Sequence, residues 1–306
     1  HGDQLDVAAM TSGSDLSHGR LGYQATLNGH GTRLGAAYST LDYALGGSLE
    51  ALRAHGTANV SSAWLSHPLV LQRDTSLDVR LQADRKRLRD AIDTASLHGD
   101  RHVTAWTLGV DGERRDGSGT TRGSLSVTQG DLAFDDATAG AADAATARTA
   151  GDYTRWNARI ERLQVLGQRT RLLLAASGQA SSDNLDASEQ FLLGGPYSVR
   201  GYSTGQFAGA SGHLLTVELR HDLDWFGTGR TEGLLFVDAG DVRFNADPWT
   251  TGPNRARVES AGIGLNWAGP AQWRASLQLA APIGGNAGAV DEDDDIRAWA
   301  WVAKGF

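Results

Sequence analysis

Short segments in which apolar and polar side chains alternate occur along the whole chain. Between residues 213 and 223, Leu215, Val217 and Leu219 fall on one face and polar side chains fall on the other. Alternation with a period of two places successive side chains on opposite faces of a β-strand. Helical periodicity is weak, so the sequence predicts an all-β, antiparallel chain of about fourteen strands. The expected strands are residues 3–12, 18–28, 32–44, 55–67, 73–88, 101–113, 119–133, 151–165, 168–181, 211–223, 231–242, 257–268, 271–282 and 294–306.

The connections between these strands alternate in length. The long ones are residues 134–150, 182–210, 243–256 and 283–293. Short turns on one rim and long loops on the other are typical of outer-membrane β-barrels. A soluble sandwich would show the same alternation along its strands, and a propeller would add a repeated blade motif, which we do not find. No apolar run approaches the roughly 18 residues of a spanning helix, so a transmembrane antiparallel β-barrel is the expected fold.

One long connection has low complexity. Residues 137–150 read ATAGAADAATARTA. Alanine favours helix, but Gly140 and the threonines are poor helix formers. We therefore expect a small, polar outer loop here rather than a helix.

Tryptophan is frequent and falls near the ends of expected strands. Five of the nine tryptophans are examples of this placement: Trp64, Trp106, Trp225, Trp267 and Trp273. An aromatic girdle at the membrane interface would explain this placement. A soluble core would explain the aromatic content equally well.

Composition narrows the function classes. The 306 residues carry a net charge of -8 with a pI near 5.6, which argues against nucleic-acid binding. Cysteine is absent from the sequence, so it offers no disulfide, thiol nucleophile or cysteine metal ligand. The chain starts with His1 rather than Met, and we expect it to be part of a longer polypeptide.

Catalytic and metal-binding patterns are sparse. The sequence has no Gly-x-Ser-x-Gly, no His-Glu-x-x-His and no P-loop. His98 and His102 have a ligand spacing only on a helix, whereas the expected strands place them beside a loop. The acidic run 291–295 could bind calcium or a basic partner, although a solvated outer loop is the favoured interpretation. We expect no catalytic residue, metal site or cofactor, and hence no enzyme.

The specific signal lies in the long connection before residue 211. Residues 188–209 read SEQFLLGGPYSVRGYSTGQFAG, with Gly194 and Gly195 preceding Val199-Arg200-Gly201-Tyr202. This resembles the conserved loop of the outer-membrane superfamily that contains the BamA insertase and the two-partner secretion transporters. The match from Glu189 through the glycine pair is most similar to the transporters, the TpsB or ShlB/FhaC/HecB haemolysin secretion and activation family.

A second motif follows in the next expected strand but one. Phe236-Val237-Asp238-Ala239-Gly240 resembles the Phe-x-Asp-x-Gly strand motif of the same family. The terminal Phe306 resembles the C-terminal signal of many barrels, although Lys304 occupies a position that is usually apolar. Shorter similarities near residues 2–5, 33–35 and 41–43 extend the resemblance over essentially the whole chain.

The resemblance implies a larger architecture than the chain displays. Family members resemble sixteen-stranded barrels preceded by two POTRA domains and a plug helix. We therefore expect residues 1–306 to be the barrel part of a longer protein, with about fourteen strands visible and the POTRA domains, plug and first strands missing. Residues 182–210 would fold inward as a loop within the lumen.

The two motifs are chemically complementary. Phe236, Asp238 and Gly240 share a strand face opposite Leu235 and Val237, so Asp238 would point into the lumen if the apolar face meets lipid. The planar guanidinium of an arginine matches a carboxylate with two parallel hydrogen bonds. The resemblance implies that Arg200 makes this contact, for which we expect about 1.5–3 kcal/mol, toward the lower end in a wet lumen.

Several functions agree with this sequence. The first is an outer-membrane pore of a Gram-negative bacterium that secretes a TpsA-type exoprotein (an adhesin, haemolysin or contact-dependent toxin), with the inward loop as gate. Its other expected partners are outer-membrane lipid and, during biogenesis, the barrel assembly machinery. The alternative is a BamA- or TamA-type insertase with the same loop. An outer-membrane enzyme lacks grouped catalytic residues, and a diffusion porin does not explain the paired motifs.

Overall fold

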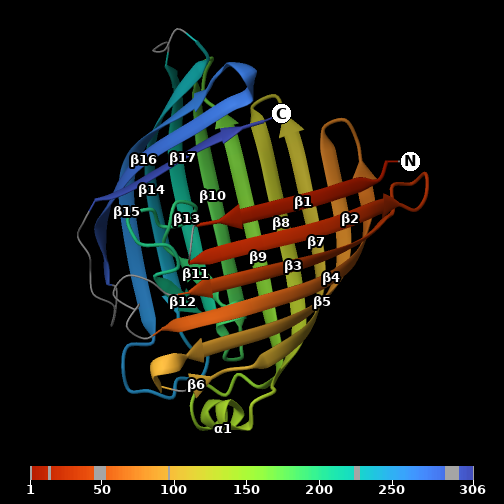
Figure 1. Cartoon of the computed structure of the whole chain (residues 1–306). Helices are drawn as coiled ribbons and strands as arrows, with labels where there is room; N and C mark the ends of the chain where they lie inside the picture. The colour runs from red at the N-terminus through yellow and green to blue at the C-terminus, as the bar shows by residue number, and fades with distance from the viewer. Residues whose placement is uncertain are drawn as a thin grey trace. The chain divides into compact units, whose positions relative to one another are not determined.

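The computed structural model consists almost entirely of antiparallel strands (Figure 1). It describes residues 2–12, 15–44, 53–95, 97–223, 228–286 and 296–305. The strands are β1 Gln4–Thr11, β2 Leu16–Thr26, β3 Arg33–Ala44, β4 Ala54–Leu71, β5 Thr75–Ile92, β6 Leu97–His98, β7 Arg101–Asp116, β8 Gly119–Phe134, β9 Gly151–Val165, β10 Thr170–Ser181, β11 Phe191–Leu193, β12 Phe207–Gly209, β13 Ser211–Leu223, β14 Arg230–Arg243, β15 Arg255–Ala268, β16 Trp273–Asn286 and β17 Arg297–Lys304.

Two compact units make up the chain. Unit 1 comprises residues 1–111 and 126–156, and unit 2 comprises residues 112–125 and 157–306, so β7, β8 and β9 contribute to both. In unit 1, neighbouring strands follow chain order from β1 to β5 and on to β7 and β8. In unit 2, the order is β9, β10, β13, β14, β15, β16 and β17.

The fourteen long strands coincide with the fourteen predicted segments. Bounds differ most at β4, β5 and β16, and in the β4–β5 hairpin both strands are longer than expected. A register shift between Pro68 and Val70 lets pairing continue past the proline. Strand β5 continues through polar residues to Ile92, because its backbone remains paired with β4 as far as Ala54.

The segment at residues 137–150 corrects one prediction. Ala137–Ala145 forms α1, the one α-helix of the described residues. Asp136 caps it by accepting a hydrogen bond from the Ala139 N–H at 2.7 Å. Asp143, near the other end, accepts from the backbone N–H groups of Thr149 and Ala150. Alanine propensity and these carboxylate contacts together outweigh the glycine and threonines.

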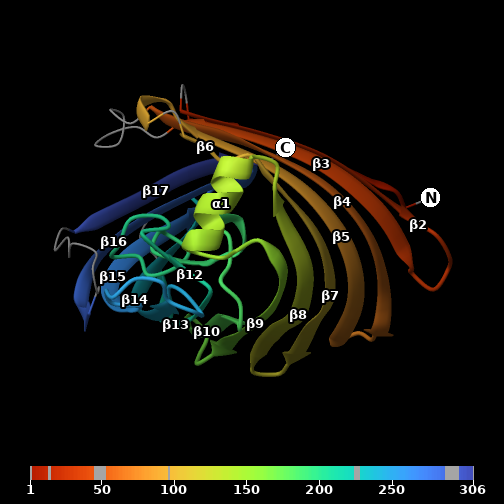
Figure 2. The ribbon, with the colours of Figure 1, turned by 90° about the horizontal axis from the view of Figure 1, so that it is seen from below.

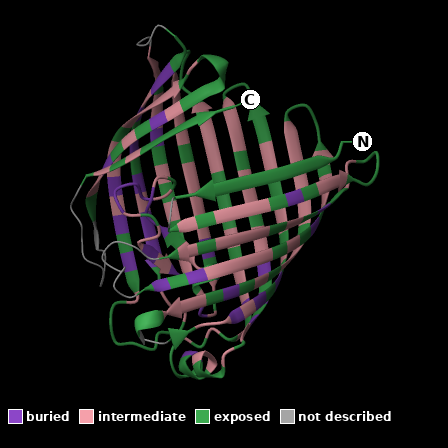
Figure 3. Cartoon of the chain, in the orientation of Figure 1, coloured by how far each residue is buried: buried purple, intermediate pink, exposed green. Residues whose placement is uncertain are grey.

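Apolar side chains cover one face of the sheet in each unit. Strand β14 lies between β13 and β15. On one of its faces Leu235 is 57% exposed and Val237 is 47% exposed, whereas Asp238 on the other face is 0% exposed. Unit 1 shows the same alternation, visible as exposed and less exposed positions along each strand (Figure 3). Exposed apolar side chains at every second position suit contact with lipid.

The tryptophan prediction holds only in part. Trp106 and Trp273 are exposed on the apolar face. Trp64 instead is buried on the opposite face of β4, where it lies 4.4 Å below the guanidinium of Arg80 and donates to Gln24. An arginine above the ring stabilises this placement. Trp225 lies outside the described residues.

Among the described residues, none of the helices has the length and apolarity needed to span a bilayer.

Candidate functional site

The connection between β10 and β13 folds back against the sheet of unit 2. Phe191–Leu193 (β11) and Phe207–Gly209 (β12) pair with each other as a small antiparallel hairpin, which the sequence did not predict. This hairpin contacts β13 and β14. Figure 2 shows the loop on the concave side of the strands from β13 to β16.

The glycine pair allows the loop to turn. Gly194 and Gly195 have φ angles of 98° and 103°, a region that disfavours residues with a Cβ atom. A Cβ on Gly194 would also lie 2.2 Å from the carbonyl oxygen of Ser203. The pair therefore brings the chain back on itself between β11 and the Arg200 segment.

A buried apolar cluster anchors the loop to the wall, which here means the sheet of unit 2. Leu193, Val199 and Phe207 of the loop pack with Val242 of β14 and Val258 of β15, all at 1% exposure or less. Tyr202 joins them and meets the Phe207 ring edge-to-face. Each fully buried side chain of this size contributes about 1.5–3 kcal/mol.

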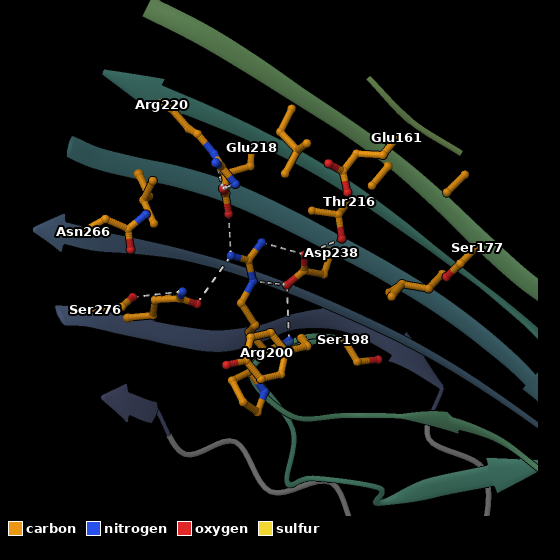
Figure 4. Close-up of a pocket in the computed structure, with 18 of the residues that line it drawn as sticks. Glu161, Ser177, Ser198, Arg200, Thr216, Glu218, Arg220, Asp238, Asn266 and Ser276 are labelled. Carbon is orange, nitrogen blue, oxygen red and sulfur yellow. Dashed lines mark hydrogen bonds and ion pairs between the residues drawn. The ribbon is translucent and has the colours of Figure 1, made fainter. Parts of the chain in front are cut away.

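Arg200 lies beside this cluster and binds Asp238 in a bidentate manner (Figure 4). Its Nε donates to Asp238 Oδ2 at 2.8 Å, and its Nη2 donates to Oδ1 at 2.9 Å. The backbone N–H of Arg200 adds a third donor to Oδ2 at 3.2 Å. The structure thus brings together the two residues that the family resemblance pairs.

Glu218 is a second carboxylate for the same guanidinium, and our sequence analysis missed its role. Arg200 Nη1 donates to Glu218 Oε2 at 2.6 Å, while Arg220 binds the other oxygen at 2.7 Å. The signal was present, because Glu218 alternates with the apolar residues Val217 and Leu219 in β13 and therefore shares the face of Thr216 and Arg220. We call Arg200 with Asp238 and Glu218 the ionic lock.

Three further groups complete the ionic lock. Thr216 donates to Asp238 Oδ1 at 2.9 Å, directly opposite it in register. The Phe236 ring lies under the guanidinium of Arg200, 3.3 Å from ring centroid to Cζ. Trp299 of β17 donates its indole N–H to the backbone carbonyl of Arg200 at 2.8 Å, across 99 positions of sequence.

Two glycines permit the close approach of loop and wall. A Cβ on Gly240 would lie 2.8 Å from Leu193 and 3.0 Å from Val199. A Cβ on Gly201 would lie 2.8 Å from the Cβ of Ser260 and from the backbone nitrogen of Pro282. Both motif glycines therefore lie where the loop touches the strands.

Burial raises the cost of removing one partner from the ionic lock. Arg200 is 5% exposed and Glu218 is 4% exposed, so the contact is more buried than the sequence analysis assumed. Burial opposes the charge of the Arg200 guanidinium, but Asp238 and Glu218 outweigh it and raise the pKa of Arg200 above its usual value. Removing one partner of such a buried pair costs about 3–5 kcal/mol, because the other charge stays behind.

A cavity of about 460 Å³ lies beside the ionic lock, within unit 2. Arg159, Glu161 and Arg220 line it together with Tyr197 of the loop. Tyr197 is 85% exposed, which contrasts with the full burial of Val199 two residues later. The loop thus presents one aromatic side chain to open space and inserts the next apolar one into the wall.

The remaining sequence predictions fall elsewhere. Phe306 and the acidic run 291–295 lie outside the described residues. His102 does not meet His98 at a metal; its Nδ1 lies 2.9 Å from Asp135 Oδ1. Within the described ranges, no three His, Cys, Asp or Glu side chains are grouped so that they could hold a metal ion.

Comparison with known proteins identifies the family. Residues 19–267 match the family model described as haemolysin secretion/activation protein ShlB/FhaC/HecB. The chain belongs to this family. The match includes the loop with Arg200 and the strand with Asp238, so the residues of the ionic lock fall within the family region.

Relatives and solved structures agree with this assignment. The heme/hemopexin transporter protein HuxB of Haemophilus influenzae is 27% identical over all of this chain and 54% of its own length. The chain therefore spans about half the length of the curated relatives it matches. CdiB from Escherichia coli superposes with a TM-score of 0.75 at 20% identity, covering 95% of this chain and 53% of CdiB.

BamA from Haemophilus ducreyi is a more distant structural neighbour. It has a TM-score of 0.65 at 14% identity and covers 98% of this chain and 65% of that BamA chain, so the likeness concerns the fold alone. These neighbours and the family assign the chain to the outer-membrane β-barrels of Gram-negative bacteria. The exposed apolar face of each unit agrees with that location.

Proposed function

We propose that this chain forms the translocation pore of a two-partner secretion system. It exports a large secreted exoprotein across the outer membrane, and the loop of residues 182–210 gates the pore. The observation that carries the proposal is the match of residues 19–267 to a secretion and activation family. The pore uses no cofactor and catalyses no covalent reaction.

The geometry of the ionic lock supports a gate that can be released. The hydrogen bonds of the lock depend on direction, so they are lost together when the loop moves. The charged groups that become exposed then form hydrogen bonds with water instead. Arg200 joins one loop to two neighbouring strands, β13 and β14. An exoprotein that displaces the loop would therefore exchange one set of contacts for another, without needing a nucleotide.

The partner is a secreted protein of TpsA type. HuxB bears the name of a heme/hemopexin transporter, which suggests that a related exoprotein uses this pore. Family resemblance implies POTRA domains in the longer protein, and we propose that these bind the exoprotein before export. During biogenesis, the barrel assembly machinery would insert the chain into outer-membrane lipid.

Secretion by a deletion strain tests the function. We expect that the exoprotein encoded beside this gene stays in the cell until the wild-type protein is restored. Arg200→Ala should strongly reduce export at an equal barrel level, and Arg159→Ala provides a matched control. Arg159 lines the same cavity and contacts Glu161 rather than the loop.

Three results would contradict the proposal or a part of it. If export proceeds in the deletion strain, the protein is not the transporter of this exoprotein. A general loss of other barrels from the outer membrane, with export unchanged, would favour the insertase instead. Normal export by Arg200→Ala would refute the gate while leaving the pore intact.

A further inference from the structure

Three arginines form a row on the apolar face of β5. Arg85, Arg87 and Arg89 are all exposed and alternate with residues that face the other way, such as the buried Leu88. Alternate residues of a strand lie about 7 Å apart, so the row extends over about 14 Å. We call these three residues the arginine row.

The arginine row begins where the apolar side chains end. Nearer the start of β5, the same face carries Val79, Leu81 and Ala83. On β4, the register partners of the row are Ser61, Asn59 and Thr57. The same face of β4 carries the apolar Ala63 and Leu65 nearer the short-turn end. The face therefore changes from apolar to polar at the same level on both strands.

Connection lengths within unit 1 show which end of the strands this is. Residues 27–32 join β2 to β3, and residues 72–74 join β4 to β5. At the opposite ends, residues 93–100 follow β5 and residues 135–150 follow β8. Longer loops face outward in outer-membrane barrels. The arginine row thus lies at the outer edge of the apolar band, at the level of the outer leaflet.

The row is poorly compensated by carboxylates. Neither Arg85 nor Arg87 forms an ion pair with any residue that the structure describes. Arg89 Nε lies 3.7 Å from Asp100 Oδ2, a long and exposed contact. Asp42 lies on the same face of β3, paired with Thr57. Two guanidinium groups are thus left to attract an anion.

We propose that the arginine row binds the phosphate groups of lipopolysaccharide, the phosphorylated glycolipid of the outer leaflet. Arginine matches a phosphate with two parallel hydrogen bonds. The hydroxyl and amide groups of Thr57, Asn59 and Ser61 can donate to the same headgroup. The acyl chains would lie on the apolar side chains below, such as Leu81, so charge and hydrophobic contacts act together. This binding does not depend on secretion.

Lipid binding to the natural full-length protein tests the proposal. We would titrate the protein in detergent with phosphorylated lipid A and count bound lipids by native mass spectrometry. Each basic residue near an anionic lipid surface contributes about 1 kcal/mol, so Arg85→Gln with Arg87→Gln should weaken binding about 30-fold. The control is Arg33→Gln with Arg73→Gln, which removes equal charge at the short-turn end and should bind as wild type does.

Two further probes identify the source of the phosphate. Dephosphorylated lipid A should bind the wild-type protein as weakly as phosphorylated lipid A binds the double variant. Inorganic phosphate at millimolar concentration should not displace lipid A, because it lacks the acyl chains. Equal binding by the double variant and its control would overturn the proposal. Equal binding of dephosphorylated lipid A, or displacement by inorganic phosphate, would do the same.

Discussion

Removal of the Arg200 side chain is the most direct perturbation of the ionic lock. Arg200→Ala leaves Asp238 and Glu218 buried without their shared cation. A cost of about 3–5 kcal/mol for breaking a buried pair corresponds to a shift of about 150- to 5000-fold in the ratio of docked to released loop. The apolar cluster around Val199 remains in place and opposes this release.

Cysteine labelling measures the shift. The chain has no cysteine, so Val199→Cys introduces a single thiol at a position with 0% exposure. That thiol reacts with a maleimide only when the loop leaves the wall. Tyr197→Cys, at an 85% exposed position, sets the rate of a fully accessible thiol.

The variants have ordered outcomes. We expect Arg200→Ala to raise the labelling rate of the Val199→Cys protein by at least about 100-fold, or to the Tyr197→Cys limit. Arg200→Lys keeps the charge but lacks the planar fork, so its rate should be intermediate. Arg159→Ala should leave the rate unchanged. An unchanged rate in Arg200→Ala would refute the reasoning and would mean that the apolar cluster alone holds the loop.

Three further predictions use the same labelling assay. Asp238→Asn should release the loop more than Glu218→Gln, because Asp238 accepts three N–H groups of the arginine and Glu218 one; the reverse order would contradict the assignment. Trp299→Phe should raise the labelling rate about fivefold, because it removes one hydrogen bond of about 1 kcal/mol. Trp301→Phe should leave the labelling rate unchanged. Equal effects of the two substitutions would show that Trp299 acts through packing instead. Gly240→Ala should displace the loop, since its Cβ would lie 2.8 Å from the β11 side chain beneath it, and wild-type labelling would show that the loop shifts without undocking.

Local sequence signals were enough for the strands and for the side that each residue faces. Alternation with a period of two is a property of the strand itself, so Asp238 and Leu235 could be assigned to opposite faces without a structure. The family motifs added the pairing of Arg200 with Asp238. The helix at 137–145 was missed because its N-cap Asp136 and the helical Asp143 act through contacts that residue propensities do not include.

Contacts between distant segments were decided by the tertiary structure. Glu218 faces Arg200 only because β13 pairs with β14 in a register that places Glu218 opposite Phe236. Trp299 of β17 donates to the backbone carbonyl of Arg200, although 99 positions of sequence separate the two residues. The low exposure of Asp238 and Glu218 also depends on the docked loop, because Arg200 of the loop covers both carboxylates. The sequence by itself therefore determined the alternating strands and the chemistry each face carries. Register and loop docking determined which of those groups meet, because both depend on long-range pairing that a local pattern does not encode.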